Sequence, residues 1–163
     1  MASEAISSSI MIIGAVLGAA VLITAILPAI FSAGDTFGSV SSSAEQKLKT
    51  DFRIINSYTA GDKTVQVWMK NVGSNRISVY DIRNSDVFIG IGSEYKRLGY
   101  ASEGTAGTFT YTLASDDGYW DIGETIEIKV TDTGMSSIGT NSVLFTFSLP
   151  NSVRRSVTFS RTG

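Results

Sequence analysis

One uncharged stretch constrains this chain more than any other feature: positions 5 to 34, between Glu4 and Asp35, hold 30 residues without an Asp, Glu, Lys or Arg. Its large apolar side chains fall on every face of a helix, so no polar stripe is left to face water. Exposing about a dozen of them would cost tens of kcal/mol, at roughly 1.5 to 3 kcal/mol each. Because a domain is stable by only about 5 to 15 kcal/mol, an isolated, water-soluble monomer is excluded.

A secretory signal peptide does not fit this stretch. Such a peptide has a basic start and an apolar core of roughly 7 to 15 residues, whereas this chain begins Met-Ala-Ser-Glu and its apolar run is much longer. Lipid or identical helices remain as surroundings. A helix at 1.5 Å per residue would make the run about 45 Å long, which exceeds a hydrocarbon core about 30 Å thick.

The helical pattern continues beyond the uncharged run. In "TFGSVSSSAEQKLKTDF" the apolar residues Phe37, Val40, Ala44 and Leu48 form one stripe, with Ser and charged residues on the other faces. We therefore predict a continuous helix to about Lys49, longer than about 65 Å. A proline removes one backbone donor and displaces the helix axis, so Pro28 should kink this helix without ending it.

Small residues within the run predict close helix packing. Gly14 and Gly18 form a small-xxx-small pair, which lets two helices approach closely; the alternative is that glycine is simply common in membrane helices. Glu4 could pair with an N-terminal amine, its own or a neighbour's, or be solvated at a membrane edge. The residues predicted to pack are Ile6, Ile10, Ile13, Gly14, Leu17, Gly18, Val21, Leu22 and Ile26.

Charge placement around the helix raises a conflict. Lys47, Lys49 and Arg53 follow the apolar run and no basic residue precedes it. By the positive-inside rule this would place the following domain in the cytoplasm. We expect instead that a basic leader was removed before Met1 or Ala2.

Residues 51–163 predict a separate β domain. Short alternating segments are separated by turn residues, and in the clearest one Ile126 and Val130 point to one side while Glu127 points to the other. About eight such strands without an intervening helical pattern favour an antiparallel, immunoglobulin-like β-sandwich after the helix, an α+β chain overall. The predicted strand segments are 51–58, 64–82 with a turn at Gly73-Ser74, 86–92, 94–100, 107–114, 124–132, 142–150 and 154–160.

The composition argues against an enzyme. The chain has no His and no Cys, so the commonest general base and two common nucleophile arrangements are missing. No phosphate-binding glycine loop occurs, and a net charge of −2 without basic clusters argues against nucleic acid. We predict no cofactor and no small-molecule substrate. Weak candidates for a Ca²⁺ site, which read equally well as turn residues, are Asp116, Asp117, Asp121 and Glu124.

Several segments together resemble a known family. The apolar N-terminal helix, the junction "AEQKLKTDFRIIN", then "VQVWMKNVGSNRI" with "DVFIGI", and later "WDIGETIEIKV" are similar to the archaellins, the pilin-like proteins of the archaeal flagellum. The strand segments are also close to the accessory archaellum protein FlaG. The resemblance implies a type IV pilin-like architecture, with helices in a filament core and β domains in an outer sheath. The basic processing peptide of such precursors is missing here.

The resemblance implies a structural subunit of an extracellular archaeal filament that serves swimming. Residues 1–50 would be inserted in the membrane before assembly and in the filament core afterwards, while residues 51–163 form the outer domain. The implied partners are copies of the same chain, the membrane before assembly, and other archaellum subunits. Two alternatives stay open: an accessory, membrane-anchored archaellum protein of the FlaG or FlaF kind that binds the cell envelope, and a membrane-anchored adhesin.

Overall fold

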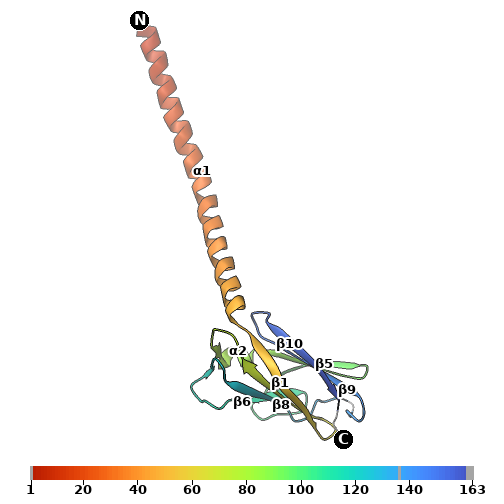
Figure 1. Ribbon diagram of the computed structural model, residues 1–163. Helices are drawn as coiled ribbons and strands as arrows, with labels where there is room; N and C mark the ends of the chain where they lie inside the picture. The colour runs from red at the N-terminus through yellow and green to blue at the C-terminus, as the bar shows by residue number, and fades with distance from the viewer. Residues whose placement is uncertain (1, 136, 161–163) are drawn as a thin grey trace. The chain divides into compact units, whose positions relative to one another are not determined.

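The computed structural model describes residues 2–135 and 137–160 (Figure 1). The chain divides into two compact units, the first ending at Ala44 and the second beginning at Glu45. We call the second one the sheet unit. The elements are α1 (Ala2–Lys49), β1 (Phe52–Ala60), β2 (Thr64–Asn71), β3 (Ile77–Ser78), α2 (Val79–Arg83), β4 (Asp86–Ile91), β5 (Glu94–Tyr100), β6 (Thr108–Thr112), β7 (Tyr119–Trp120), β8 (Thr125–Val130), β9 (Ser142–Ser148) and β10 (Arg154–Ser160).

Helix α1 is continuous over 48 residues and ends at Lys49, which confirms the predicted long helix. At 1.5 Å per residue it is about 72 Å long. It runs through Pro28 without ending, and the kink expected there stays a prediction. Glu4 lies in its first turn and Lys47 and Lys49 in its last, so the charges at both ends oppose the helix dipole favourably.

The sheet unit is built from two antiparallel sets of four strands, β1-β2-β8-β6 and β5-β4-β9-β10. A short parallel pairing of β5 with β6 joins the two sets into one eight-stranded sheet. Strands β1 and β10 are the ends of that order and lie next to each other, so the sheet is nearly closed (Figure 1). The predicted antiparallel β domain after a long helix is thereby confirmed, with its two layers continuous through β5 and β6.

Strand alternation places the core between the two sets. In β2 and β8 the inward residues are paired across the strands, as Val67 is with Ile128, and both are fully buried. Aromatic rings bridge the layers: the centroid of Phe52 in β1 lies 5.5 Å from that of Phe147 in β9 and 5.8 Å from that of Trp120 in β7. Burying these rings supplies much of the favourable free energy of folding for this unit.

The segment 79–83 departs from the prediction, which placed a strand across it. It forms the short helix α2, because the hydroxyl of Ser78 accepts a hydrogen bond from the amide of Tyr80 at 3.2 Å and so caps the first turn. The preceding strand β3 is only two residues long and pairs with β7. The hydrophobic pattern did not predict α2, because Ile82 is buried in this helix just as it would be in a strand.

Candidate functional site

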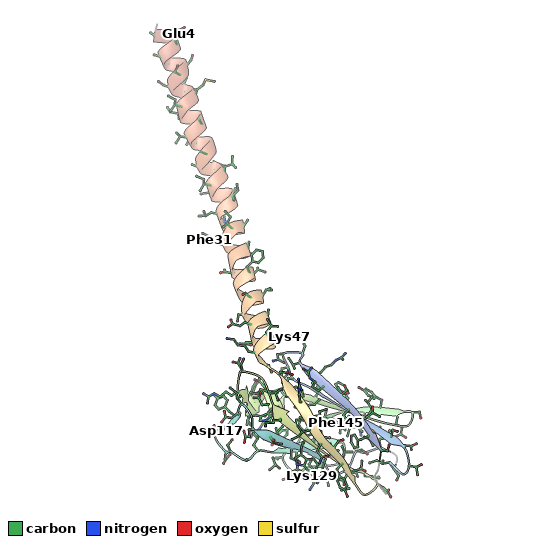
Figure 2. All side chains as sticks on the ribbon, viewed as in Figure 1. Glu4, Phe31, Lys47, Asp117, Lys129 and Phe145 are labelled. Atoms are coloured by element: carbon green, nitrogen blue, oxygen red, sulfur yellow. The ribbon has the colours of Figure 1, made fainter. Side chains whose placement is uncertain are left out.

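The surface of α1 is the most unusual feature of the molecule, because no residue of Ala2–Lys49 is buried. Its side chains project on all sides of the helix (Figure 2). The large apolar residues predicted to pack are Ile6, Ile10, Ile13, Leu17, Val21, Leu22 and Ile26, and their exposed fractions run from 47 to 69%. The chain itself therefore gives these side chains no cover, and their packing against other helices stays a prediction.

Such a helix needs apolar surroundings from outside the chain. At about 25 cal/mol per Å² of apolar surface, a dozen uncovered side chains represent a larger free energy than the whole stability of an ordinary domain. By length and composition α1 is able to cross a membrane. It is also longer than the roughly 20 residues that a bilayer needs.

Hydroxyl groups on α1 are satisfied by the helix itself. Ser8 donates a hydrogen bond to the main-chain oxygen of Glu4 at 2.9 Å, Ser9 to that of Ala5 at 2.8 Å, and Thr24 to that of Ala20 at 2.8 Å. A polar group placed in apolar surroundings is costly unless it is hydrogen-bonded. Because these hydroxyls need no external partner, they are compatible with lipid or with a packed helix bundle.

The glycines of α1 have no steric role within the chain. A Cβ atom added at Gly14 or Gly18 would meet nothing within 4 Å, and the same holds at Gly34 and Gly38. A side chain added there therefore meets no steric obstacle within the isolated chain. Glu4 is exposed near the N-terminal end of α1 (Figure 2), and its proposed charge pairing stays a prediction.

A second site lies within the sheet unit, where α1 ends and β1 begins, and we call it the joint: residues 49–52 with the loops 71–75 and 120–124. Two main-chain oxygens, those of Lys49 and Asp51, accept four hydrogen bonds from loop amides. The donors to Lys49 are Ser74 at 2.9 Å and Asn75 at 3.3 Å, and those to Asp51 are Val72 at 3.0 Å and Gly73 at 2.8 Å.

Gly73 is required at the joint by close backbone approach. A Cβ atom there would lie 2.5 Å from the oxygen of Lys49 and 2.6 Å from the amide nitrogen of Asp51. Both neighbours are backbone atoms, so neither is able to move aside cheaply. The sequence reading of Gly73-Ser74 as a turn missed this contact, because it depends on a segment about 20 positions earlier.

Asn71 holds the two loops of the joint together. Its side chain is fully buried, and its amide nitrogen donates to the main-chain oxygens of Asn75 at 2.9 Å and Trp120 at 3.1 Å. Its side-chain oxygen accepts from the amide of Gly73 at 3.1 Å. A signal for it exists in the sequence: Asn71 continues the inward-facing register of Val67 and Met69, where a polar side chain needs partners.

Glu124 holds together the acidic loop, residues 115–124. Its carboxylate accepts hydrogen bonds from the amide and hydroxyl of Ser115 at 2.9 and 2.8 Å and from the amide of Asp121 at 2.9 Å. Burial on its own would raise the pKa of Glu124, but the hydrogen bonds from Asp121 and Ser115 outweigh it, so the pKa lies below its ordinary value. The indole nitrogen of Trp120 donates to the main-chain oxygen of Glu124 at 2.9 Å.

Of the four acidic residues weighed as Ca²⁺ ligands, Asp117 and Glu124 accept hydrogen bonds from main-chain amides of their own loop. Asp117 accepts a hydrogen bond from the amide of Tyr119 at 3.1 Å, and Asp116 and Asp117 are exposed. Across residues 2–135 and 137–160, no three His, Cys, Asp or Glu side chains gather in a group suited to a metal ion. The contacts of Asp117 and Glu124 fit the turn interpretation, and the choice between turn residues and Ca²⁺ ligands stays a prediction.

The fold and the uncovered helix define a structural protein of type IV pilin-like architecture. The family model for archaeal-type flagellin matches residues 2–159. An uncharacterised protein of Archaeoglobus fulgidus is 36% identical over 163 residues, which cover 98% of this chain and 99% of the relative. The chain belongs to the archaeal-type flagellin family, whose members are structural proteins and not enzymes.

Solved structures agree on the fold. The archaeal flagellum of Methanospirillum hungatei matches with a TM-score of 0.70 and 13% identity, covering 96% of this chain and 93% of that one. The archaellum periplasmic stator protein FlaG of Sulfolobus acidocaldarius matches with a TM-score of 0.57 and 23% identity, covering 68% of this chain and 99% of that one. At these identities the likeness concerns the fold alone.

Proposed function

We propose that this protein is a subunit of the archaellum filament and polymerises through α1. Each copy is inserted in the membrane by its helix before assembly and then exchanges lipid for a bundle of identical helices. The sheet units form the outer wall of an extracellular filament that serves swimming. The observation that carries the proposal is that no residue of α1 is buried within its own chain.

Two further observations support a polymer over a permanent membrane anchor. The uncharged run of α1 is about 45 Å long and a hydrocarbon core is about 30 Å thick, so lipid alone leaves part of the run uncovered. The flagellum of Methanospirillum hungatei matches over 96% of this chain, which includes the helix. A heterologous, non-closing contact between identical subunits generates a helical filament.

An accessory role in the archaellum is the second candidate, favoured by the likeness of the sheet unit to FlaG, which is matched over 99% of its length. Such a protein stays in the membrane at low copy number and uses its sheet unit to bind the cell envelope. Electron microscopy of full-length protein purified from its membrane separates the two. Filaments support the first proposal, and discrete complexes without filaments reject it in favour of the accessory role.

A variant pair tests whether α1 makes the contact. Gly14→Leu and Gly18→Leu add large side chains where the isolated chain leaves open space, so the sheet unit should fold normally while polymerisation is lost. Gly99→Leu is the matched control, because a Cβ there also meets nothing within 4 Å but lies on β5 of the sheet unit. Normal filaments from both helix variants would contradict close packing at these glycines.

A further inference from the structure

Strand β1 enters the sheet at a mechanically weak place. It stands at one end of the strand order beside β2, with which it forms a hairpin. The hairpin turn follows Ala60, so its open end is the pair Phe52 and Asn71, where the chain arrives from α1. A pull on the chain at Lys49 away from β2 would load the pairs of an unprotected hairpin one after another, and the strand would peel off.

We propose that the joint prevents this peeling and is the connection through which force on assembled helices passes into the sheet unit. The proposal rests on the filament function proposed above. Its physical basis is that bonds loaded together share a force, whereas bonds loaded in sequence fail one at a time. The joint places several bonds ahead of the first β1–β2 pair.

The first of these bonds are the four amide contacts to Lys49 and Asp51. They extend the hairpin past Phe52, and each of the two oxygens accepts two of them, so a pull on residue 49 has to break the bonds of each pair together. The absent side chain of Gly73 is what lets the loop come close enough, since a Cβ would lie 2.5 Å from backbone. The loop is itself fastened to the neighbouring loop 120–124 by the buried amide of Asn71.

Arg155 links Asp51 to the strand at the opposite end of the strand order. It lies in β10 and its guanidinium reaches the carboxylate of Asp51 at 2.5 Å. The same guanidinium lies over the ring of Phe52, 5.9 Å from its centroid. A force on Asp51 is therefore shared between β1 and β10, and through β10 with β9 and β4. The ion pair spans the seam between the two terminal strands.

Single-molecule pulling of the full-length chain in detergent micelles tests the joint directly. The chain has no native Cys, so Ser42→Cys in α1 and Lys129→Cys in β8 provide unique attachment points on the two sides of it. The measurement is the lifetime of the folded sheet unit at constant force. Forced unfolding reports the unfolding rate rather than the equilibrium stability.

Two arginine variants, which we call the arginine pair, test the ion pair with Asp51 with the smaller expected effect. Arg155→Gln should shorten the lifetime under force roughly threefold, in keeping with a partly exposed ion pair. Arg154→Gln is the matched control, because this neighbouring arginine makes no ion pair with Asp51 and should leave the lifetime unchanged. Equal lifetimes for the two variants would overturn the role of Arg155.

Two glycine variants test the loop contacts of the joint with the larger expected effect. Gly73→Ala should shorten the lifetime by about tenfold or more, because it displaces the loop from both carbonyls. Gly99→Ala, where a Cβ meets open space, should have no effect. Thermal unfolding of each variant confirms that it is folded before pulling, and the arginine pair decides the matter if Gly73→Ala does not fold.

Pulling on single chains needs no polymer, so its result is independent of filament imaging. If lifetimes are unchanged in Arg155→Gln and Gly73→Ala while filaments form, the joint proposal is wrong and the filament function stands. If lifetimes fall as expected but no filaments form, the joint resists force as inferred and the filament function is wrong.

Discussion

Phe147 and Phe31 show how differently the two units treat the same side chain. Phe147, in β9, is fully buried among the rings of the sheet unit, whereas Phe31, in α1, is 65% exposed. The difference follows from the sequence pattern: alternation in the strands gives each an apolar side that a facing strand covers, while the uncharged run of α1, which contains Phe31, is apolar all round. The sheet unit buries an apolar core of its own, whereas α1 leaves its large apolar side chains exposed.

A charge placed within the apolar run of α1 should have the largest effect on assembly. Leu17→Asp places a carboxylate where lipid or neighbouring helices are expected, at a penalty of several kcal/mol in every copy. We expect complete loss of filaments with an unchanged far-ultraviolet spectrum of the sheet unit. Ser39→Asp, in the part of α1 that already carries polar residues, serves as control. Filaments from Leu17→Asp would contradict an apolar setting for α1.

Removing each phenylalanine in turn sharpens the comparison. Phe147→Ala should lower the free energy of unfolding of the sheet unit by about 3 to 5 kcal/mol, because it leaves a cavity in the core. Phe31→Ala should change that free energy by less than about 0.5 kcal/mol while weakening assembly. Denaturant unfolding in detergent, followed by the fluorescence of buried Trp120, measures the first effect, and filament yield measures the second.

Loss of the Glu124 carboxylate tests the loop network of the sheet unit. Glu124→Gln should lower the free energy of unfolding by about 1 to 2 kcal/mol at pH 7, because charge-assisted hydrogen bonds are replaced by weaker ones. The folded pKa of Glu124 is lowered, so its contribution is present above the unfolded pKa of about 4.3 and is lost as the pH falls through the folded value. The gap between the two proteins should therefore narrow as the pH falls below that unfolded value.

The surface ion pair of Arg97 with Asp86 should have the smallest effect. These side chains are 66 and 33% exposed, and such pairs contribute about 1 kcal/mol or less. Arg97→Gln should leave filament yield unchanged and shift the unfolding midpoint only slightly. A loss of filaments from this substitution would place an assembly contact on the outer surface of β5 and point to an interface beyond α1.

The sequence pattern predicted the elements well where a single local period applies. The uncharged run and the stripe from Phe37 to Leu48 predicted one helix to Lys49, and alternation predicted the long strands. It did not predict α2, which depends on one capping hydroxyl at Ser78. It also missed the joint, because the need for Gly73 arises from backbone that is distant in sequence. The partners proposed for α1 are other molecules, so no pattern within one chain identifies them.

The hydroxyls of Ser8, Ser9 and Thr24 are each occupied by their own helix, and this bears on how a bundle of such helices behaves when bent. In the proposed filament, α1 would contact its neighbours through dispersion, which has little directional preference. One helix would then slide along the next by a small distance without breaking a side-chain hydrogen bond. Bending a filament assembled in this way would cost little free energy.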